Sequence, residues 1–398
     1  MIDPVREIVP GAPALDGAVP LAAPDIGDLE RTLVDESLRS GWVAYGPFVD
    51  RLEEEVRRML NVKHAVAVAS GTAALHLALL AAGVRTGDEV IVSALTFISP
   101  AFAIRYAGAR PVFVDAERSY RQLDPGRLAD FLQEECEPTE EGLCRRASGR
   151  RIGAIVPVDV LGHPADVDAV MALAVEFDIP VVEDAAEALG ASLRGRSAGA
   201  LADVGCLSFN GNKIVTAGSG GMVVTDDARI AERVLYLATQ AKDDPLEYVH
   251  GAIGFNYRLS NVHAALGYGQ LLRLDEFVTA KRRIAAAYAD GLDGIAGIEL
   301  PREAPDAFST FWLYTIHVHA DEYGTSSRDL LARLLEAGIQ ARPLWQPLHR
   351  SPALAGSESP GCPVADDLYE TGLSLPSSVT ITPSDQERII DVITQTRS

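Results

Sequence analysis

The segment Ser208-Phe-Asn-Gly-Asn-Lys-Ile-Val-Thr-Ala-Gly-Ser-Gly-Gly-Met222 is the strongest guide to the architecture, because it sets a polar, glycine-rich turn between two apolar runs. The run before the turn, 203–209, predicts a strand that carries the hydroxyl of Ser208, and the run 221–225 predicts a second strand. The turn presents one amine, that of Lys213, at a fixed point. A lysine in such a place holds a phosphate or forms a Schiff base.

A second segment, Pro180-Val-Val-Glu-Asp-Ala-Ala-Glu187, predicts a buried strand that ends in acidic residues. Asp184 then lies at the carboxyl end of this strand, which is the edge where ligands bind in open α/β sheets. A carboxylate there can keep a pyridine nitrogen protonated, so Asp184 and Lys213 together indicate pyridoxal phosphate as the cofactor. The alternative for Asp184 is the N-cap of a helix that begins at Ala185.

A third segment, Ala65-Val-Ala-Val-Ala-Ser-Gly-Thr72, is followed by an apolar helical run and predicts a strand, a tight turn and a helix. The backbone N–H groups and the positive end of the helix dipole at Gly71 and Thr72 form a site for an anion such as phosphate. Ser208 is a second candidate phosphate ligand. A simple capped helix is the alternative for the turn.

Strand-like runs alternate with helical periods over the first part of the chain. The expected strands are 65–69, 89–94, 111–115, 153–160, 180–184, 203–209 and 221–225, with helices near 72–83, 98–107, 125–135 and 165–178. This alternation predicts an α/β fold with a mainly parallel, seven-stranded sheet sandwiched by helices. Right-handed crossovers collect the strand-end loops on one edge, so Ser70 to Thr72, Phe97, Asp159, Asp184 and Ser208 are expected in one site.

Three parts are expected along the chain: an N-terminal arm at 1–25, a large cofactor-binding domain at 26–265 and a smaller C-terminal α+β domain at 266–398. One or two long helices are expected at about 261–291, the charged segment 134–151 is expected to be an insertion or an exposed helix end, and 352–363 is expected to be a loop. The elements expected in the small domain are strands near 299–300, 312–319 and 339–343 and a helix at 326–337.

Composition and charge exclude several classes of protein. The formal net charge of −21 argues against binding to nucleic acid, which needs a basic surface, so any anionic substrate must be met by local arginines. The four cysteines have no metal-site spacing, and no His, Cys and Asp cluster suggests a metal centre. With no leader-like start and no apolar run long enough to span a bilayer, a cytoplasmic protein without membrane contact is expected.

These segments together resemble the nucleotide-sugar aminotransferases of the DegT/DnrJ/StrS type, which are pyridoxal-phosphate enzymes with the aspartate-aminotransferase-like fold (fold type I). The resemblance covers nearly the whole chain, although Ser219 stands where many relatives carry an acidic residue or glycine. Further segments that carry it are Ser40-Gly-Trp-Val-Ala-Tyr-Gly-Pro47, Ser70-Gly-Thr-Ala-Ala74, Thr96-Phe97, Val182-Glu-Asp-Ala-Ala-Glu187 and Gly254-Phe-Asn-Tyr-Arg-Leu-Ser-Asn261.

The resemblance implies roles for particular residues. It makes Lys213 the Schiff-base and proton-transfer residue, stacks Phe97 on the cofactor ring and places Glu187 beside the phenolic oxygen. It also implies a homodimer with shared sites, in which Asn256 reaches the partner's phosphate and Arg258 the incoming substrate. The alternatives are a core phenylalanine for Phe97, a helix first-turn acid for Glu187 and a structural ion-pair partner for Arg258.

The expected reaction is amino transfer from glutamate or glutamine to C4 of a TDP- or UDP-linked 4-keto-6-deoxyhexose, because the Lys213 loop and Gln240-Ala-Lys-Asp-Asp244 resemble that branch. His163 and His349 are candidates for substrate contact. A 3-aminotransferase for 3-keto sugars and a non-enzymatic regulatory protein of the same fold stay open as alternatives. A dehydratase of the family would carry histidine in place of Lys213.

Overall fold

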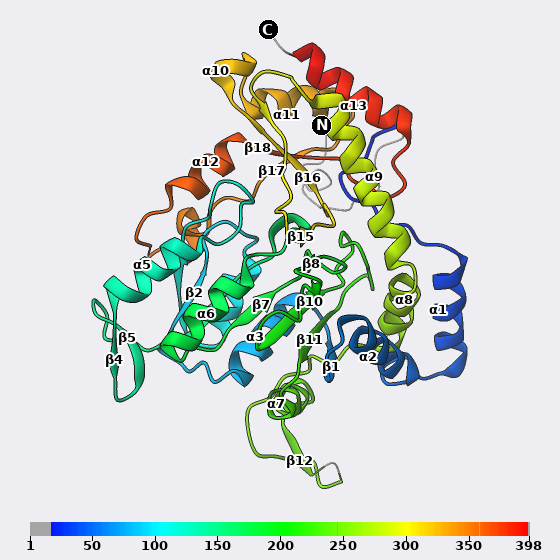
Figure 1. Ribbon diagram of the computed structural model, residues 1–398. Helices are drawn as coiled ribbons and strands as arrows, with labels where there is room; N and C mark the ends of the chain where they lie inside the picture. The colour runs from blue at the N-terminus through cyan, green and yellow to red at the C-terminus, as the bar shows by residue number, and fades with distance from the viewer. Residues whose placement is uncertain (1–16, 245, 358, 397–398) are drawn as a thin grey trace.

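The computed structural model describes residues 17–396, apart from 245 and 358, and its centre is a seven-stranded sheet (Figure 1). A four-stranded part, β1-β11-β10-β7, and a three-stranded part, β3-β2-β6, are joined by parallel bridges between Ile155 and Val181 and between Val158 and Asp184. β11 runs against the other strands, which are parallel to one another. The strands are β1 (His64–Val68), β2 (Glu89–Ser93), β3 (Arg110–Val114), β6 (Ile152–Val156), β7 (Val182–Asp184), β10 (Val204–Ser208) and β11 (Gly221–Thr225).

Helices cover both faces of this sheet, because successive strand residues point to opposite sides and are apolar on both. In β2, Ile91 packs with one set of helices, whereas Val90 and Val92 pack with the other. The first set is α5 (Pro125–Glu135) and α6 (Val167–Phe177), and the second set includes α3 (Gly71–Ala81), α4 (Ser99–Tyr106) and α7 (Ala228–Ala238). The expected α/β sandwich is thus confirmed, and most of the observed strands start and end close to the expected positions. The strand expected at 153–160 is shorter, because β6 ends at Val156 and a 3-10 turn begins at Val160.

A second hydrophobic core is formed between a smaller sheet and its helices in the C-terminal part of the chain, at the top of Figure 1. Its strand order is β14-β16-β18-β17, and its helices pack on one another and on the sheet. The elements are β14 (Ile298–Glu299), β16 (Tyr314–Val318), β17 (Arg342–Pro343), β18 (Gly372–Leu375), α11 (Ser327–Glu336) and α13 (Pro383–Thr396). The long helix α9 (Leu274–Leu292) contributes Phe277 to the main core and Tyr288 to this one.

The remaining elements surround these two cores. The helices are α1 (Asp28–Ser40), α2 (Pro47–Leu60), α8 (Asn261–Leu271), α10 (Ala320–Tyr323), α12 (Pro363–Thr371), and the 3-10 turns η1 (Val160–Gly162), η2 (Leu348–Arg350) and η3 (Pro352–Leu354). The paired short strands are β4 (Cys136–Thr139) with β5 (Gly142–Arg145), β8 (Ser192–Leu193) with β9 (Arg196–Ser197) and β15 (Ala307–Phe308), and β12 (Lys242–Asp244) with β13 (Val249–His250).

One expectation about the elements needs correction, and one observed strand has no counterpart among the expected elements. The segment 134–151, expected as an insertion or exposed helix end, forms the β4–β5 hairpin after α5 ends at Glu135. β18 was not expected, although it lies between β16 and β17. The domain bounds 26–265 and 266–398 stay predictions, and most of the arm at 1–25 lies outside the described residues.

Candidate active site

Lys213 lies in the loop between β10 and β11, and its amine has two contacts of different kinds. The Lys213 N–H donates to the Asn210 carbonyl at 3.0 Å, which closes a turn and fixes the start of the side chain. The Nζ atom donates to Glu187 Oε1 at 3.3 Å and lies 4.0 Å from the centroid of the Trp312 ring. A carboxylate and the face of an indole therefore hold the amine in place.

Glu187 is fixed by the backbone as well as by the lysine. Its Oε2 accepts the N–H of Leu161 at 2.9 Å, and Leu161 has a φ of +62°, in the left-handed region that a branched residue seldom adopts. No helix begins at Ala185, since the chain turns there, so the helix first-turn interpretation of Glu187 is wrong. Glu187 instead links the strained turn at Leu161 to the amine of Lys213, and strain of this kind gathers at functional sites.

Asp184 is the last residue of β7 and is 4% exposed. Its Oδ1 accepts the N–H of Ala186 at 3.1 Å in a turn, so the helix N-cap interpretation is also wrong. Burial is the main cause that raises the pKa of Asp184 from 3.8 to about 7, and the charge of Lys213 opposes the shift. A buried carboxyl group with a raised pKa favours a cationic partner, because a positive charge would stabilise its ionised form.

Hydroxyl groups and two helix N-termini meet at the same edge of the sheet. Ser70 caps α3 by accepting the N–H of Ala73 at 3.1 Å. Gly71 packs so closely on Ser208 that an added Cβ would lie 2.9 Å from the Ser208 Cβ, which explains why this position is glycine. Thr72 Oγ1 donates to Ser99 Oγ at 3.0 Å, and Ser99 begins α4. Free N–H groups and hydroxyls at a helix start suit a phosphate.

Phe97 follows β2 at this edge, and 49% of its surface is exposed. The core alternative for Phe97 is therefore wrong, because nearly half of the residue is open to solvent. An exposed aromatic ring at the edge of the sheet is a suitable platform for a flat heteroaromatic ring.

Trp312 and Lys281 have no signal in the sequence, yet both contribute to the site. Trp312 Nε1 donates to the carbonyl of Asn212 at 2.8 Å, so the indole is tied to the residue that precedes Lys213. The Trp312 carbonyl accepts a hydrogen bond from Lys281 Nζ at 2.8 Å, and the same amine donates to the Ser377 carbonyl. Burial lowers the pKa of Lys281 from 10.5 to about 7.

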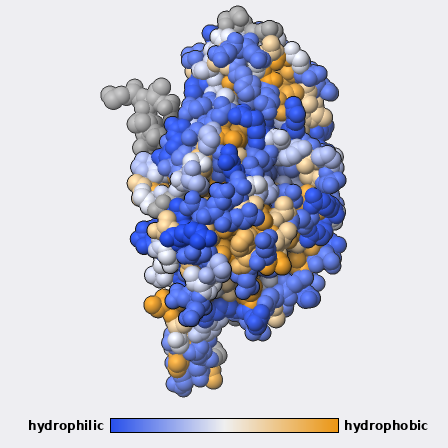
Figure 2. Space-filling model, turned by 60° about the vertical axis from the view of Figure 1, so that its left-hand side comes forward, coloured by the Kyte–Doolittle hydropathy of each residue, from blue (hydrophilic) through white to orange (hydrophobic). Residues whose placement is uncertain are grey.

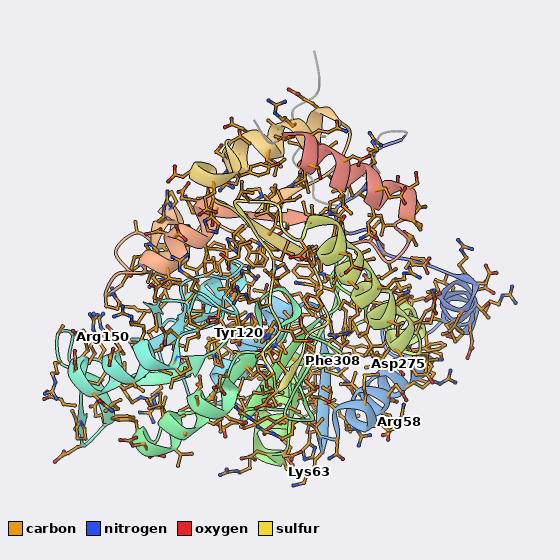
Figure 3. All side chains as sticks on the ribbon, turned by 45° about the horizontal axis from the view of Figure 1, so that its top comes forward. Arg58, Lys63, Tyr120, Arg150, Asp275 and Phe308 are labelled. Atoms are coloured by element: carbon orange, nitrogen blue, oxygen red, sulfur yellow. The ribbon has the colours of Figure 1, made fainter. Side chains whose placement is uncertain are left out.

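The histidines differ in what they contact. His163 uses both ring nitrogens, one with the Pro164 carbonyl and the other as acceptor for the Ala304 N–H, and it stacks on Tyr120 near the middle of Figure 3. These bonds give His163 a structural role. His349 Nε2 contacts Asp366 at 3.2 Å, and its 3-10 turn is bound to the end of β2 through the Leu348 N–H and the Ala94 carbonyl.

Two residues of the segment at 254–261 differ in their surroundings, since one is exposed and the other is paired within its own chain. Asn256 is exposed. Arg258 Nη1 forms an ion pair with Glu53 at 2.5 Å and donates to the Ala67 carbonyl at 2.7 Å. The structure thus shows Arg258 in the ion pair that was its alternative role, and a role toward a partner stays a prediction.

The residues at this edge fit pyridoxal phosphate. The hydroxyls and N–H groups at 70–72 and at Ser208 match its phosphate, Phe97 and Asp184 match its ring, and Lys213 matches its aldehyde. In the part of the chain that the structure describes, no group of three or more His, Cys, Asp or Glu residues could hold a metal ion. No helix within the described ranges is long and apolar enough to cross a membrane.

Comparison with known proteins identifies the family of the chain. A model of the DegT/DnrJ/EryC1/StrS aminotransferase family matches residues 24–394. The GDP-perosamine synthase of Caulobacter vibrioides is 35% identical over 380 residues, which are 95% of this chain and 98% of that protein. The dTDP-3-amino-3,4,6-trideoxy-alpha-D-glucose transaminase of Streptomyces venezuelae is 36% identical over 361 residues, which are 89% of each chain.

Among solved structures, DesI in the presence of its TDP-sugar product has a TM-score of 0.86 and 29% sequence identity. That likeness covers 97% of this chain and 96% of DesI. The chain therefore belongs to the DegT/DnrJ/EryC1/StrS aminotransferase family, a family of pyridoxal-phosphate enzymes.

Proposed function

We propose that this aminotransferase moves an amino group from glutamate, or glutamine, to C4 of a nucleotide-linked 4-keto-6-deoxyhexose. The observation that carries the proposal is the position of the Lys213 amine, held between Glu187 and Trp312 at the sheet edge that also presents Asp184. Support for C4 comes from the Lys213 loop and the segment at 240–261, which resemble C4-aminating relatives.

Each candidate residue has a separate task in this proposal. Pyridoxal phosphate, when bound, supplies the carbonyl that accepts the amine and a ring that takes up an electron pair. Lys213 Nζ would take the proton from the α-carbon of the amino donor and deliver it to the aldehyde carbon of the cofactor. In the second half-reaction it would carry a proton from that carbon to C4 of the sugar. Asp184 keeps the ring nitrogen protonated, and Thr72 and Ser208 bind the phosphate. One site serves both substrates in turn, so ping-pong kinetics are expected.

We also propose a homodimer in which Asn256 of one protomer completes the site of the other. The β12–β13 hairpin projects from the body of the molecule (Figure 1), and Figure 2 shows apolar side chains on the projecting arm. Leu246, between β12 and β13, is 86% exposed, and Ile253, between the hairpin and Asn256, is 88% exposed. Apolar side chains so exposed on a projecting arm support contact with another protein surface.

A 3-aminotransferase is the second candidate function, because the transaminase from Streptomyces venezuelae is named for a 3-amino sugar. The nucleotide also differs among relatives, whose names contain GDP and dTDP. Product analysis decides between the candidates. The protein is incubated with glutamate or glutamine and with TDP-, UDP- and GDP-linked 4-keto and 3-keto sugars, and the product is identified by NMR. Amination at C3 alone would overturn the C4 assignment, and no amination of any sugar would overturn the proposed function.

A further inference from the structure

Two further buried carboxyl groups belong to residues that adjoin Asp184, and neither has a role in the proposed reaction. Asp159 follows β6, and Glu183 precedes Asp184 in β7; neither has any exposed surface. The parallel bridge between Val158 and Asp184 puts those two residues on one face of the sheet. Because side chains alternate along a strand, Asp159 and Glu183 share the opposite face.

The two carboxyl groups receive different numbers of hydrogen bonds. Glu183 accepts the N–H of Gly199 at 2.6 Å and that of Leu201 at 2.9 Å, one on each oxygen, and a further N–H from Ala202. Asp159 Oδ1 accepts one N–H, from Ala165 at 2.8 Å. Several backbone donors around one carboxylate stabilise its ionised form, so Glu183 is the better anion of the two.

The second carboxyl oxygen of Asp159 indicates the position of a proton. Asp159 Oδ2 is buried and receives no N–H or O–H from the residues that the structure describes, while the Asp159 and Glu183 side chains lie within hydrogen-bond range of each other. Ionised carboxyl groups only accept hydrogen bonds, so this contact is a bond only if one of them carries a proton. Burial raises the pKa of both groups, and that of Asp159 rises well above its ordinary range.

We infer that Asp159 is a protonated carboxylic acid that donates to ionised Glu183, and that this pair positions Asp184. The role of Asp184 in this statement rests on the proposed function. The Asp159 N–H donates to the Asp184 carbonyl at 3.0 Å, so a shift of Asp159 moves the backbone of Asp184. The proton also leaves two negative charges rather than three among the three carboxyl groups, so ionised Asp184 is repelled by Glu183 but not by Asp159.

Three substitutions test whether Asp159 donates a proton to Glu183. Asp159→Asn keeps an N–H that can donate to Glu183, so it should fold and bind cofactor like the wild type. Asp159→Ala removes the donor and leaves the Glu183 carboxylate buried without it. Glu183→Gln places an amide NH₂ against backbone N–H donors, so it should be the less stable of the two amide variants.

The first measurement is infrared spectroscopy of the cofactor-free protein at about pH 8.5, where Asp184, with a pKa of about 7, is mostly ionised. A carbonyl stretch of a protonated carboxyl should be present in the wild type and in Asp184→Asn, and absent in Asp159→Asn. A wild type without this band would overturn the inference, and so would a band that persists in Asp159→Asn. The wild-type reading needs no substitution, so it holds even if a variant fails to fold.

The second measurement is the Kd of pyridoxal phosphate. Asp159→Ala should raise it roughly tenfold, the cost of one buried hydrogen bond, whereas Asp159→Asn should leave it near the wild-type value. Asp203→Ala is the matched control, because Asp203 Oδ2 accepts the Val181 N–H at 2.9 Å at the other end of the same strand. Equal losses in Asp159→Asn and Asp159→Ala, or in Asp203→Ala and Asp159→Ala, would overturn the positioning role.

These readouts also separate the inference from the proposed function. A protein that binds the cofactor but aminates no sugar would contradict the proposed function and leave the infrared band in place. Normal amination without the infrared band would contradict the proton on Asp159 and leave the proposed function intact.

Discussion

Lys213, Asp184 and Glu187 could be predicted from the sequence because each lies at or just after the end of a strand, and strand ends of a parallel sheet meet at one edge. Trp312 could not be predicted in the same way. Its ring reaches Lys213 from the segment that precedes β16, and this depends on how the second core packs against the first. A contact between distant parts of the chain leaves no local pattern.

Replacing Lys213 by alanine should abolish amino transfer and leave cofactor binding largely intact. The phosphate and ring contacts come from other residues, whereas the amine that moves the proton is lost, a loss of at least roughly a thousandfold in kcat. Absorbance of the bound cofactor measures its binding, and a turnover assay measures amino transfer. Lys63→Ala, at an exposed lysine before β1 on the periphery of Figure 3, should behave like the wild type. Near-normal turnover in Lys213→Ala would remove this lysine from the mechanism.

Asp184→Asn should lower kcat by a large factor, on the order of a hundredfold or more, with a smaller effect on the Kd of the cofactor. A neutral amide does not hold the proton on the ring nitrogen, so the ring takes up electrons poorly. The measurement is kcat from a full kinetic analysis of the loaded variant. An unchanged kcat accompanied by lower stability would show that Asp184 is only structural.

The same variant should change how stability depends on pH in the cofactor-free protein. The pKa of Asp184 is raised from 3.8 to about 7 by burial, so between these values the folded state holds a proton that the unfolded state lacks. Stability attributable to this group is then present below pH 4 and is lost as the pH rises to 7. Urea unfolding should find Asp184→Asn more stable than the wild type at pH 8, by on the order of a few kcal/mol, and closer to it at pH 4. A constant difference across this range would contradict the raised pKa.

Among the elements, the strands of the large sheet were predictable because apolar runs and helical periods alternate regularly. The β4–β5 hairpin was missed because its residues are charged and polar and pair only with each other. β18 was missed because it is four residues long and depends on β16 and β17 for its hydrogen bonds. Short strands formed by distant pairing lack the periodicity on which a sequence prediction rests.

The α9 helix carries a buried amine whose titration can be tested. A neutral amine has two N–H groups, and Lys281 uses them for the carbonyls of Trp312 and Ser377. Since burial lowers its pKa from 10.5 to about 7, the unfolded state holds more protons between these values, and stability should rise with pH through this window. Lys281→Met should reduce the rise between pH 7 and 9 measured by urea unfolding, whereas Lys63→Met should not. An equal rise in Lys281→Met and the wild type would show that Lys281 stays charged in the fold.

At the level of the whole molecule, the resemblance to the family implies active sites that are shared between the two chains of a homodimer. Asn256 is exposed and follows the projecting hairpin, while Arg258 is bound to Glu53 within its own chain. Asn256 is therefore the better probe of a shared site, because its replacement disturbs no ion pair. Asn256→Asp keeps the size of the side chain and adds a negative charge, which should repel the phosphate of the cofactor in the partner's site.

Mixed dimers test this sharing directly. Lys213→Ala and Asn256→Asp homodimers are each expected to be inactive. If the two are unfolded together and reassembled at random, about half of the dimers should contain one chain of each kind, as two-fold symmetry requires. In each mixed dimer, one site joins intact Lys213 to intact Asn256, and the other carries both defects. Roughly a quarter of all sites should then regain activity. If Asn256 instead served the site of its own chain, every site would keep one defect and no activity would return, which would refute the shared site while leaving the chemistry of Lys213 unaffected.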